Sequence, residues 1–179
     1  MNIFVLSRSP ILAARMQCNR HCVRMILESA QLLSNAVPEN VAPYKRTHYS
    51  HPCSVWVRES ANNFCWLYLH AMELCREYTR RYGREHASQK VIERCCELGP
   101  VRSGSPRTFV QVMPEMYSQE DPVEAYRAYY IGEKAGFARW APRATAPDWW
   151  PFDDTKWIQN TKINVFSSRR SRTDKHAQR

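Results

Sequence analysis

Apolar residues recur along the chain at spacings close to 3.6, the period of an α-helix, over four stretches. The first predicted helix covers residues 11–35, and Pro38 follows it. The second covers residues 54–82, where Ser54 can cap the start and Gly83 provides a usual end. At about 1.5 Å per residue, this second helix would span roughly 43 Å.

Two shorter helices are predicted further along. One covers residues 88–98, and a break rich in glycine and proline follows at residues 99–106. The other covers residues 121–140 and begins at Asp121-Pro122-Val123-Glu124. That string combines a capping side chain, a first-turn proline and an acidic residue that can reach back. Prolines exclude another long helix after it, at Pro142, Pro147 and Pro151.

The N-terminal residues 1–6 are largely apolar and predict a short strand or an extended core segment. We therefore expect a mainly α, single-domain helical bundle with this N-terminal segment and an irregular C-terminal wrap. The domain would cover residues 1–166. Residues 167–179 contain almost no apolar side chain, so they are expected to be a disordered basic tail.

Charge changes the functional picture, because the formal net charge is +9. The tail contributes five basic residues against one acidic residue. Nucleic acid is the expected partner, and the tail could touch its phosphates or another acidic surface. No apolar run reaches the roughly 18 residues of a membrane span, so no membrane partner is expected. Seven cysteines without a signal peptide favour free thiols and a cytoplasmic protein.

The first candidate site lies on the first predicted helix. His21, Arg24 and Glu28 stand at i, i+3 and i+7 and therefore share one face. An imidazole, a guanidinium and a carboxylate together suit acid–base chemistry and phosphate binding. The alternative is a solvated, salt-bridged stripe.

A second cluster contains histidine and cysteine, the residue types that bind zinc. The loop at residues 47–53 includes His48 and His51, and Cys18 and Cys22 could add ligands by residue type. No Cys-x-x-Cys pair is present, so we expect no metal and no cofactor. The histidines of the loop could instead hydrogen-bond the backbone.

Polar residues also interrupt the two later apolar helices. Arg58, Glu59 and two asparagines, Asn62 and Asn63, could line a pocket, form a buried network or face solvent. In the last helix, Arg127 and Lys134 stand seven residues apart on one face among aromatic residues. Those two cations could hold phosphates, while the rings either stack on bases or pack in the core.

Several strings resemble a family of small proteins from tailed phages and bacteria. They are the N-terminal Asn2-Ile3-Phe4-Val5-Leu6, the stretch that begins at Cys18, His51-Pro52-Cys53-Ser54-x-Trp56, and Ala125-Tyr126-Arg127-x-Tyr129-Tyr130. More remotely, the layout resembles the small all-helical pyrimidine-dimer DNA glycosylases. The histidine loop at residues 44–52 leads into a helix that closes on Arg81-Tyr82-Gly83, and a Tyr-Tyr-Gly-Lys-like stretch comes late, at residues 129–134.

This resemblance implies an α-amine as nucleophile and a glutamate on the first helix as its acid–base partner. In this chain the amine would be that of Met1, because Asn2 is too large for efficient methionine removal, and the carboxylate would be Glu28. We expect a DNA base-excision glycosylase-like enzyme that flips a base out of the stack. Further site residues would be His21, Arg24, Arg58, Arg127, Lys134 and His51.

Glu28 and His21 are expected to share a cleft with Arg58, although the residues belong to different helices. Two other functions stay open at this point. The chain could be a non-catalytic accessory factor that binds nucleic acid or protein, or an enzyme that modifies free nucleotides. Glu28 close to an amine in a concave basic surface would favour the glycosylase.

Overall fold

The computed structural model describes residues 1–154, so the basic tail predicted at residues 167–179 lies outside the described residues. The described part is mainly helical and contains no strand. Its α-helices are α1 (Pro10–Arg15), α2 (Asn19–Ser34), α3 (Pro52–Glu59), α4 (Ala61–Tyr82), α5 (Gln89–Leu98) and α6 (Pro122–Lys134). Two short 3-10 helices are Glu39–Val41 and Glu115–Tyr117.

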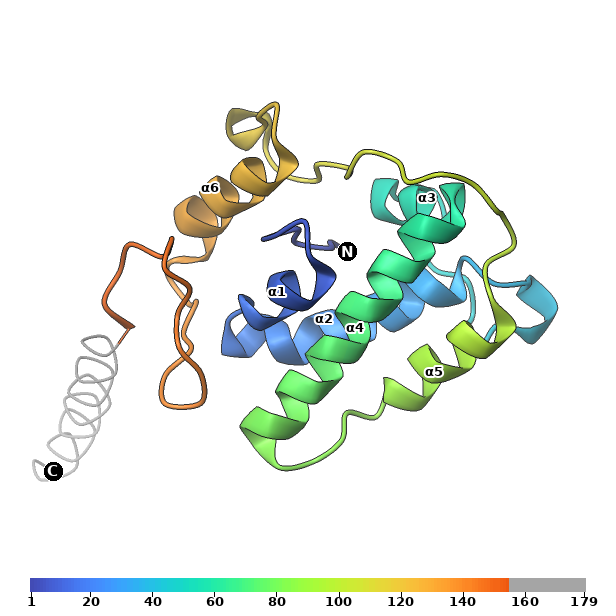
Figure 1. Ribbon diagram of the computed structural model, residues 1–179, viewed down its shortest axis with the longest axis horizontal. Coiled ribbons are helices and arrows are strands. Elements are labelled where there is room, and N and C mark those ends of the chain that lie inside the picture. The colour runs from blue at the N-terminus through green and yellow to red at the C-terminus, as the bar shows by residue number, and fades with distance from the viewer. Residues whose placement is uncertain (155–179) are drawn as a thin grey trace, which may run out of the picture.

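The centre of the fold is the α2–α4 pair, against which α1 and α5 also pack (Figure 1). The side chains between these helices are fully buried and apolar, and they include Ile26, Leu33, Leu67, Leu74 and Ile92. Helix α6 lies on the other side of the N-terminal segment, away from α5. Residues 99–121 run from the end of α5 past α3 to the start of α6 as a long strap.

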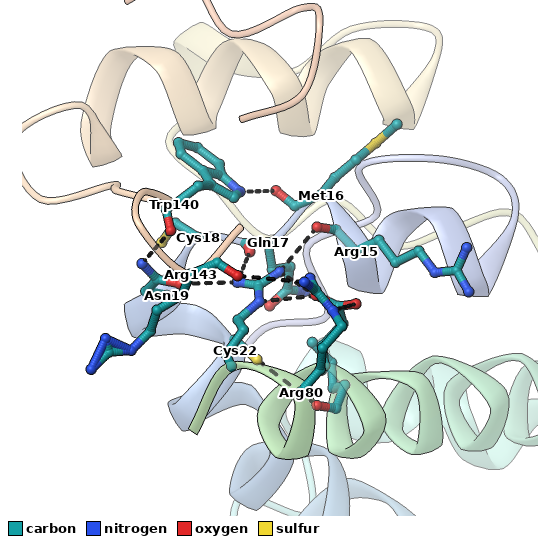
Figure 2. A network of polar contacts seen from close by, with 12 residues as sticks. Arg15, Met16, Gln17, Cys18, Asn19, Cys22, Arg80, Trp140 and Arg143 are labelled. Atoms are coloured by element: carbon teal, nitrogen blue, oxygen red, sulfur yellow. Dashed lines mark hydrogen bonds and ion pairs between the residues drawn. The ribbon is translucent and has the colours of Figure 1, made fainter. Parts of the chain in front are cut away.

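The first predicted helix is in fact two helices, and the break lies at Gln17 and Cys18. Distant groups satisfy the backbone at this break. The Cys18 N–H donates to the Tyr130 hydroxyl at 3.1 Å, and the Trp140 indole donates to the Met16 carbonyl at 3.1 Å. Figure 2 shows Trp140 beside Met16 and Asn19. Because these partners come from the other end of the chain, the local pattern did not predict the break.

The second predicted helix is also divided, at Ser60, whose backbone is extended. The Ser60 hydroxyl caps α4 by accepting a hydrogen bond from the Asn63 N–H at 3.1 Å. The Asn63 side chain donates to the Trp56 carbonyl at 2.8 Å and accepts from the Arg107 N–H at 3.0 Å. Asn63 therefore belongs to a buried structural network, one of the three interpretations that the sequence left open. The helix before it starts at Pro52 with His51 as its cap, two residues earlier than predicted.

Of the two predictions for the N-terminal residues, the core segment is confirmed and the strand is not, because residues 3–6 are buried but form no strand. The Asn2 side-chain oxygen accepts hydrogen bonds from the N–H groups of Ile3 at 2.8 Å and Phe4 at 3.0 Å. Phe4 has a positive φ of 39°, which no regular strand contains. The local hydrogen bonds thus bend the chain, while Val5 and Leu6 still enter the core.

The last helix ends at Lys134 rather than near residue 140, and residues 135–154 form an irregular wrap. All seven cysteines are free thiols, and five of them are buried. Within residues 1–154, no group of three or more potential ligands is arranged to hold a metal ion. None of the helices in that same range is long and apolar enough to cross a membrane.

The α1–α2 corner is held to α4 by a buried ion pair. The Arg81 guanidinium, whose side chain is fully buried, lies 2.7 Å from Glu77 and donates to the carbonyls of Arg15 and Gln17. Figure 2 shows Arg15, Gln17 and Asn19 around this network. Desolvation alone would raise the pKa of Glu77, but hydrogen bonds from Arg80 and Arg81 outweigh it and lower the pKa. This network fixes the start of α2, the helix that carries several residues of the candidate site.

Candidate active site

A cleft of about 300 Å³ forms where the N-terminal segment, α2 and the end of α6 meet. Figure 1 shows the N-terminus between α6 and the α2–α4 pair. The lining residues come from these three parts of the chain. They are Met1, Asn2, Phe4, Arg20, His21, Arg24, Met25, Glu28, Tyr129, Lys134 and Phe137.

The α-amine of Met1 lies 3.8 Å from Glu28 Oε2 in this cleft. The same oxygen accepts a 3.0 Å hydrogen bond from the Asn2 backbone N–H. The other oxygen, Oε1, lies 3.3 Å from Arg24 Nε one helical turn away. The Glu28 side chain is 17% exposed, so it keeps contact with solvent while its orientation is fixed.

Met1 is anchored by its own side chain, which is only 4% exposed and packs against the core. The residue as a whole is partly exposed, so its accessible surface belongs to the backbone. Asn2 adds a second anchor, because its amide donates to the Val112 carbonyl at 2.8 Å. The strap before α6 therefore helps to hold the amine beside Glu28.

His21 lies deeper in the cleft and is 6% exposed. Desolvation by burial, followed by the nearby charges of Lys134, Arg20 and Arg24, lowers its pKa to about 3. The imidazole is therefore neutral near pH 7. It stacks on the Phe4 ring at 4.5 Å, and its Nδ1 has no hydrogen-bond partner among the described residues.

Cations and aromatic rings form the rest of the wall. Lys134 Nζ donates to the Tyr129 hydroxyl at 2.9 Å and lies 4.2 Å from the ring centre. The Arg20 guanidinium lies 4.7 Å over the Phe137 ring. Arg20 was not predicted as a site residue, although it stands four residues before Arg24 and eight before Glu28, on the same helical face.

The structure thus brings five predicted site residues to one cleft, and these are Met1, His21, Arg24, Glu28 and Lys134. His51 is close by: burial first and then the N-terminal amine lower its pKa, while Glu28 acts in the opposite direction. The His51 ring accepts a hydrogen bond from the Cys53 N–H. Hydrogen bonding to the backbone was the alternative to metal binding for the histidines of this loop.

Two predicted residues do not line this cleft. Arg58 lines a different pocket, because hydrogen bonds to the carbonyls of Ser54 and Tyr49 direct its guanidinium there. The expectation of a cleft shared by Arg58 with Glu28 and His21 was therefore wrong. Arg127 donates to the Leu6 carbonyl at 3.1 Å and pairs with Glu124 at 3.1 Å, so it braces the N-terminal segment.

Comparison with known proteins supports the resemblance noted in the sequence. The family model of the pyrimidine dimer DNA glycosylases matches residues 1–90. No match was found among curated proteins or among solved structures. The matched half contains the amine, Arg24 and Glu28, whereas Lys134 lies beyond it. The chain belongs to the pyrimidine dimer DNA glycosylase family.

Proposed function

We propose that this protein is a DNA glycosylase that excises a damaged pyrimidine by attack of the Met1 α-amine, with Glu28 as general acid–base. The observation that carries this proposal is the 3.8 Å separation of the amine from Glu28 Oε2 in a cleft rich in cations. A nucleophile and a carboxylate within reach of one another are what amine-based covalent catalysis requires. The family name supplies the substrate, a pyrimidine dimer in DNA.

The neutral amine would attack C1′ of the damaged nucleotide, and the bond from C1′ to the base would break. The base keeps the bonding electron pair and takes up a proton. The attached nitrogen then gives a proton to Glu28. The electron pair of the nitrogen forms the C1′=N bond as the C1′–O4′ bond breaks, and Glu28 returns the proton to O4′. A protonated imine would then join C1′ to Met1.

The other groups of the cleft fit this reaction. Arg24 fixes Glu28 Oε1 and leaves Oε2 facing the amine. Arg20 and Lys134 would hold the phosphates beside the attacked sugar. The neutral His21 lines the cleft and would pack against the flipped nucleotide without adding a charge.

Retention of Met1 is part of the proposal. Its side chain is 4% exposed and packs against the core, so removing it would leave a cavity there. We also propose a cytoplasmic location, because seven cysteines without a disulfide suit a reducing compartment.

Borohydride trapping tests the proposal. Duplex DNA with one pyrimidine dimer and the same duplex without damage are incubated with the protein and sodium borohydride, which reduces an imine to a stable adduct. We expect an adduct with the damaged duplex, joined to the amine of Met1 by peptide mass spectrometry. Glu28→Gln should reduce it, whereas Glu97→Gln, a change of a 64% exposed residue on α5, should not.

Binding to damaged DNA without any adduct would reject catalysis and favour the accessory-factor alternative. An adduct at the amine of Asn2, with Met1 absent, would keep the glycosylase but reject retention of Met1. Excision of bases from free nucleotides, but not from duplex DNA, would favour the third alternative.

A further inference from the structure

A second pocket of about 470 Å³ lies near the C-terminal end of α2 and gathers three arginines. They come from three separate segments: Arg46 from the loop before α3, Arg58 from α3 and Arg102 from the strap. Tyr49, Glu59 and the end of α2 complete the walls. Nothing in the catalytic proposal uses this pocket.

Tyr49 organises two of these arginines. The Arg58 guanidinium lies 3.3 Å from the centre of the Tyr49 ring, and that of Arg46 lies 4.5 Å from it. Arg58 is further fixed because its Nε donates to the Ser54 carbonyl at 3.0 Å and its Nη2 to the Tyr49 carbonyl at 2.8 Å. These neutral acceptors orient the guanidinium without cancelling its charge.

Carboxylates neutralise the cluster only in part. Arg46 pairs with Glu39 at 2.7 Å, and Glu59 lines the pocket. Arg102 has no hydrogen-bond or ion-pair partner within residues 1–154 and is exposed. Desolvation, followed by the charges of Arg46 and Arg102, lowers the pKa of Arg58. Three like charges held together against repulsion form a site suited to an anion.

The pocket lies beside the catalytic cleft along α2. Asn35 in its wall follows Glu28 by seven residues, which is about 10 Å along the helix axis. Tyr49 lines the pocket, while His51, two residues later, is influenced by the Met1 amine and by Glu28. Every nucleotide of a DNA strand carries a phosphate, so a strand bound in the catalytic cleft would bring a phosphate only a few nucleotides away to this pocket.

We propose that Arg46, Arg58 and Arg102 hold a phosphodiester of the DNA within a few nucleotides of the nucleotide bound in the catalytic cleft. The proposal rests on the proposed function, because that function supplies the DNA and its position. Planar guanidinium groups match the oxygens of a phosphate bidentately, and the Tyr49 ring keeps two of them pre-oriented. The site reads the backbone and so adds affinity without sequence preference.

Methylphosphonate scanning tests this site. Single uncharged methylphosphonates replace successive phosphates on each strand of a duplex containing one dimer, and Kd is measured by fluorescence anisotropy. In the unmodified protein, neutralising one or two phosphates within a few nucleotides of the dimer should weaken binding roughly tenfold. Arg102→Gln should weaken binding to the unmodified duplex by a similar factor and remove the effect of those methylphosphonates.

Arg102 is the primary variant because it has no structural partner to lose among the described residues. Arg94→Gln is the matched control, since Arg94 is an exposed arginine on α5 paired with Glu97, and it should behave like the unmodified protein. Equal sensitivity to every methylphosphonate in the unmodified protein and in Arg102→Gln would overturn the site. So would an unchanged affinity of Arg102→Gln for the unmodified duplex.

Anisotropy and borohydride trapping separate the two proposals. Trapping without the Arg102-dependent phosphate effect would reject this site and leave the glycosylase standing. The phosphate effect without trapping would keep the site and reject catalysis. An effect of Arg102→Gln on binding of inorganic phosphate, but not on DNA, would reject the DNA assignment.

Discussion

The backbone N–H of Asn2 donates a 3.0 Å hydrogen bond to Oε2 of Glu28, the carboxylate oxygen that lies 3.8 Å from the Met1 amine. One oxygen therefore faces both the anchored second residue and the free end of the chain. Because Asn2 is itself held by the Val112 carbonyl, the amine can be displaced from Glu28 only if the N-terminal segment is also displaced. This relationship gives the first two predictions.

Glu28→Gln should lower the rate of imine trapping by about 100-fold or more, the usual contribution of a general acid–base. Affinity for the damaged duplex should stay within a few-fold, because the variant keeps the shape of the cleft and its cations. Single-turnover trapping and anisotropy measure the two quantities separately. A variant with full trapping activity would exclude Glu28 as the proton carrier.

Asn2→Leu should slow trapping by roughly tenfold to 100-fold while DNA affinity changes little. Leucine cannot accept from Ile3 and Phe4 or donate to Val112, so the amine would lose its fixed position. Single-turnover trapping at saturating DNA measures the effect. Asn62→Leu is the comparison, since Asn62 is an exposed asparagine whose side chain donates to the Gly104 carbonyl. A rate for Asn2→Leu equal to that comparison would contradict the positioning role.

Glu77→Gln should destabilise the protein by about 3–5 kcal/mol, because it leaves the buried guanidinium of Arg81 without its counter-charge. The midpoint of urea unfolding measures the change. Glu97→Gln removes an exposed i,i+3 pair and should cost less than about 1 kcal/mol. Similar losses in the two variants would contradict a structural role for the Glu77–Arg81 pair.

Acid should destabilise the folded protein through His21. Its pKa is about 3 in the folded protein, against 6.5 for an ordinary histidine, so the unfolded chain binds more protons between these limits. Above pH 6.5, His21 does not lower the free energy of unfolding. Below pH 6.5, it lowers this free energy by about 1.4 kcal/mol for each pH unit, down to about pH 3. Between pH 7.5 and 5, the free energy of unfolding should therefore fall by about 2 kcal/mol less in His21→Phe than in the unmodified protein.

Urea unfolding at the two pH values measures that difference. His70 is a useful reference, because burial also lowers its pKa to about 3 and its contribution remains in His21→Phe. Parallel loss of stability in the unmodified protein and in His21→Phe would show that His21 is not held neutral by the fold.

Much of the helical content could be predicted from the sequence, because helix formation depends on local spacing and capping. Asp121 caps α6, and Gly83 ends α4 in the left-handed conformation, as their positions in the sequence indicated. The face shared by Arg24 and Glu28 followed from helical geometry alone. These features involve neighbours within about one turn of the chain.

Only the tertiary structure decided where the predicted helices break and which polar residues meet. Tyr130 and Trp140 satisfy the backbone near Cys18 from more than 110 residues away, and no local pattern contains that information. The sequence predicted Arg58 in the catalytic cleft, yet its hydrogen bond to the Tyr49 carbonyl directs its guanidinium to another pocket. The amine meets Glu28 because the N-terminal segment is bent by Asn2 and buried between α2 and α6. Spacing along a helix fixes neighbours on one face, but the packing of separate segments determines which faces converge.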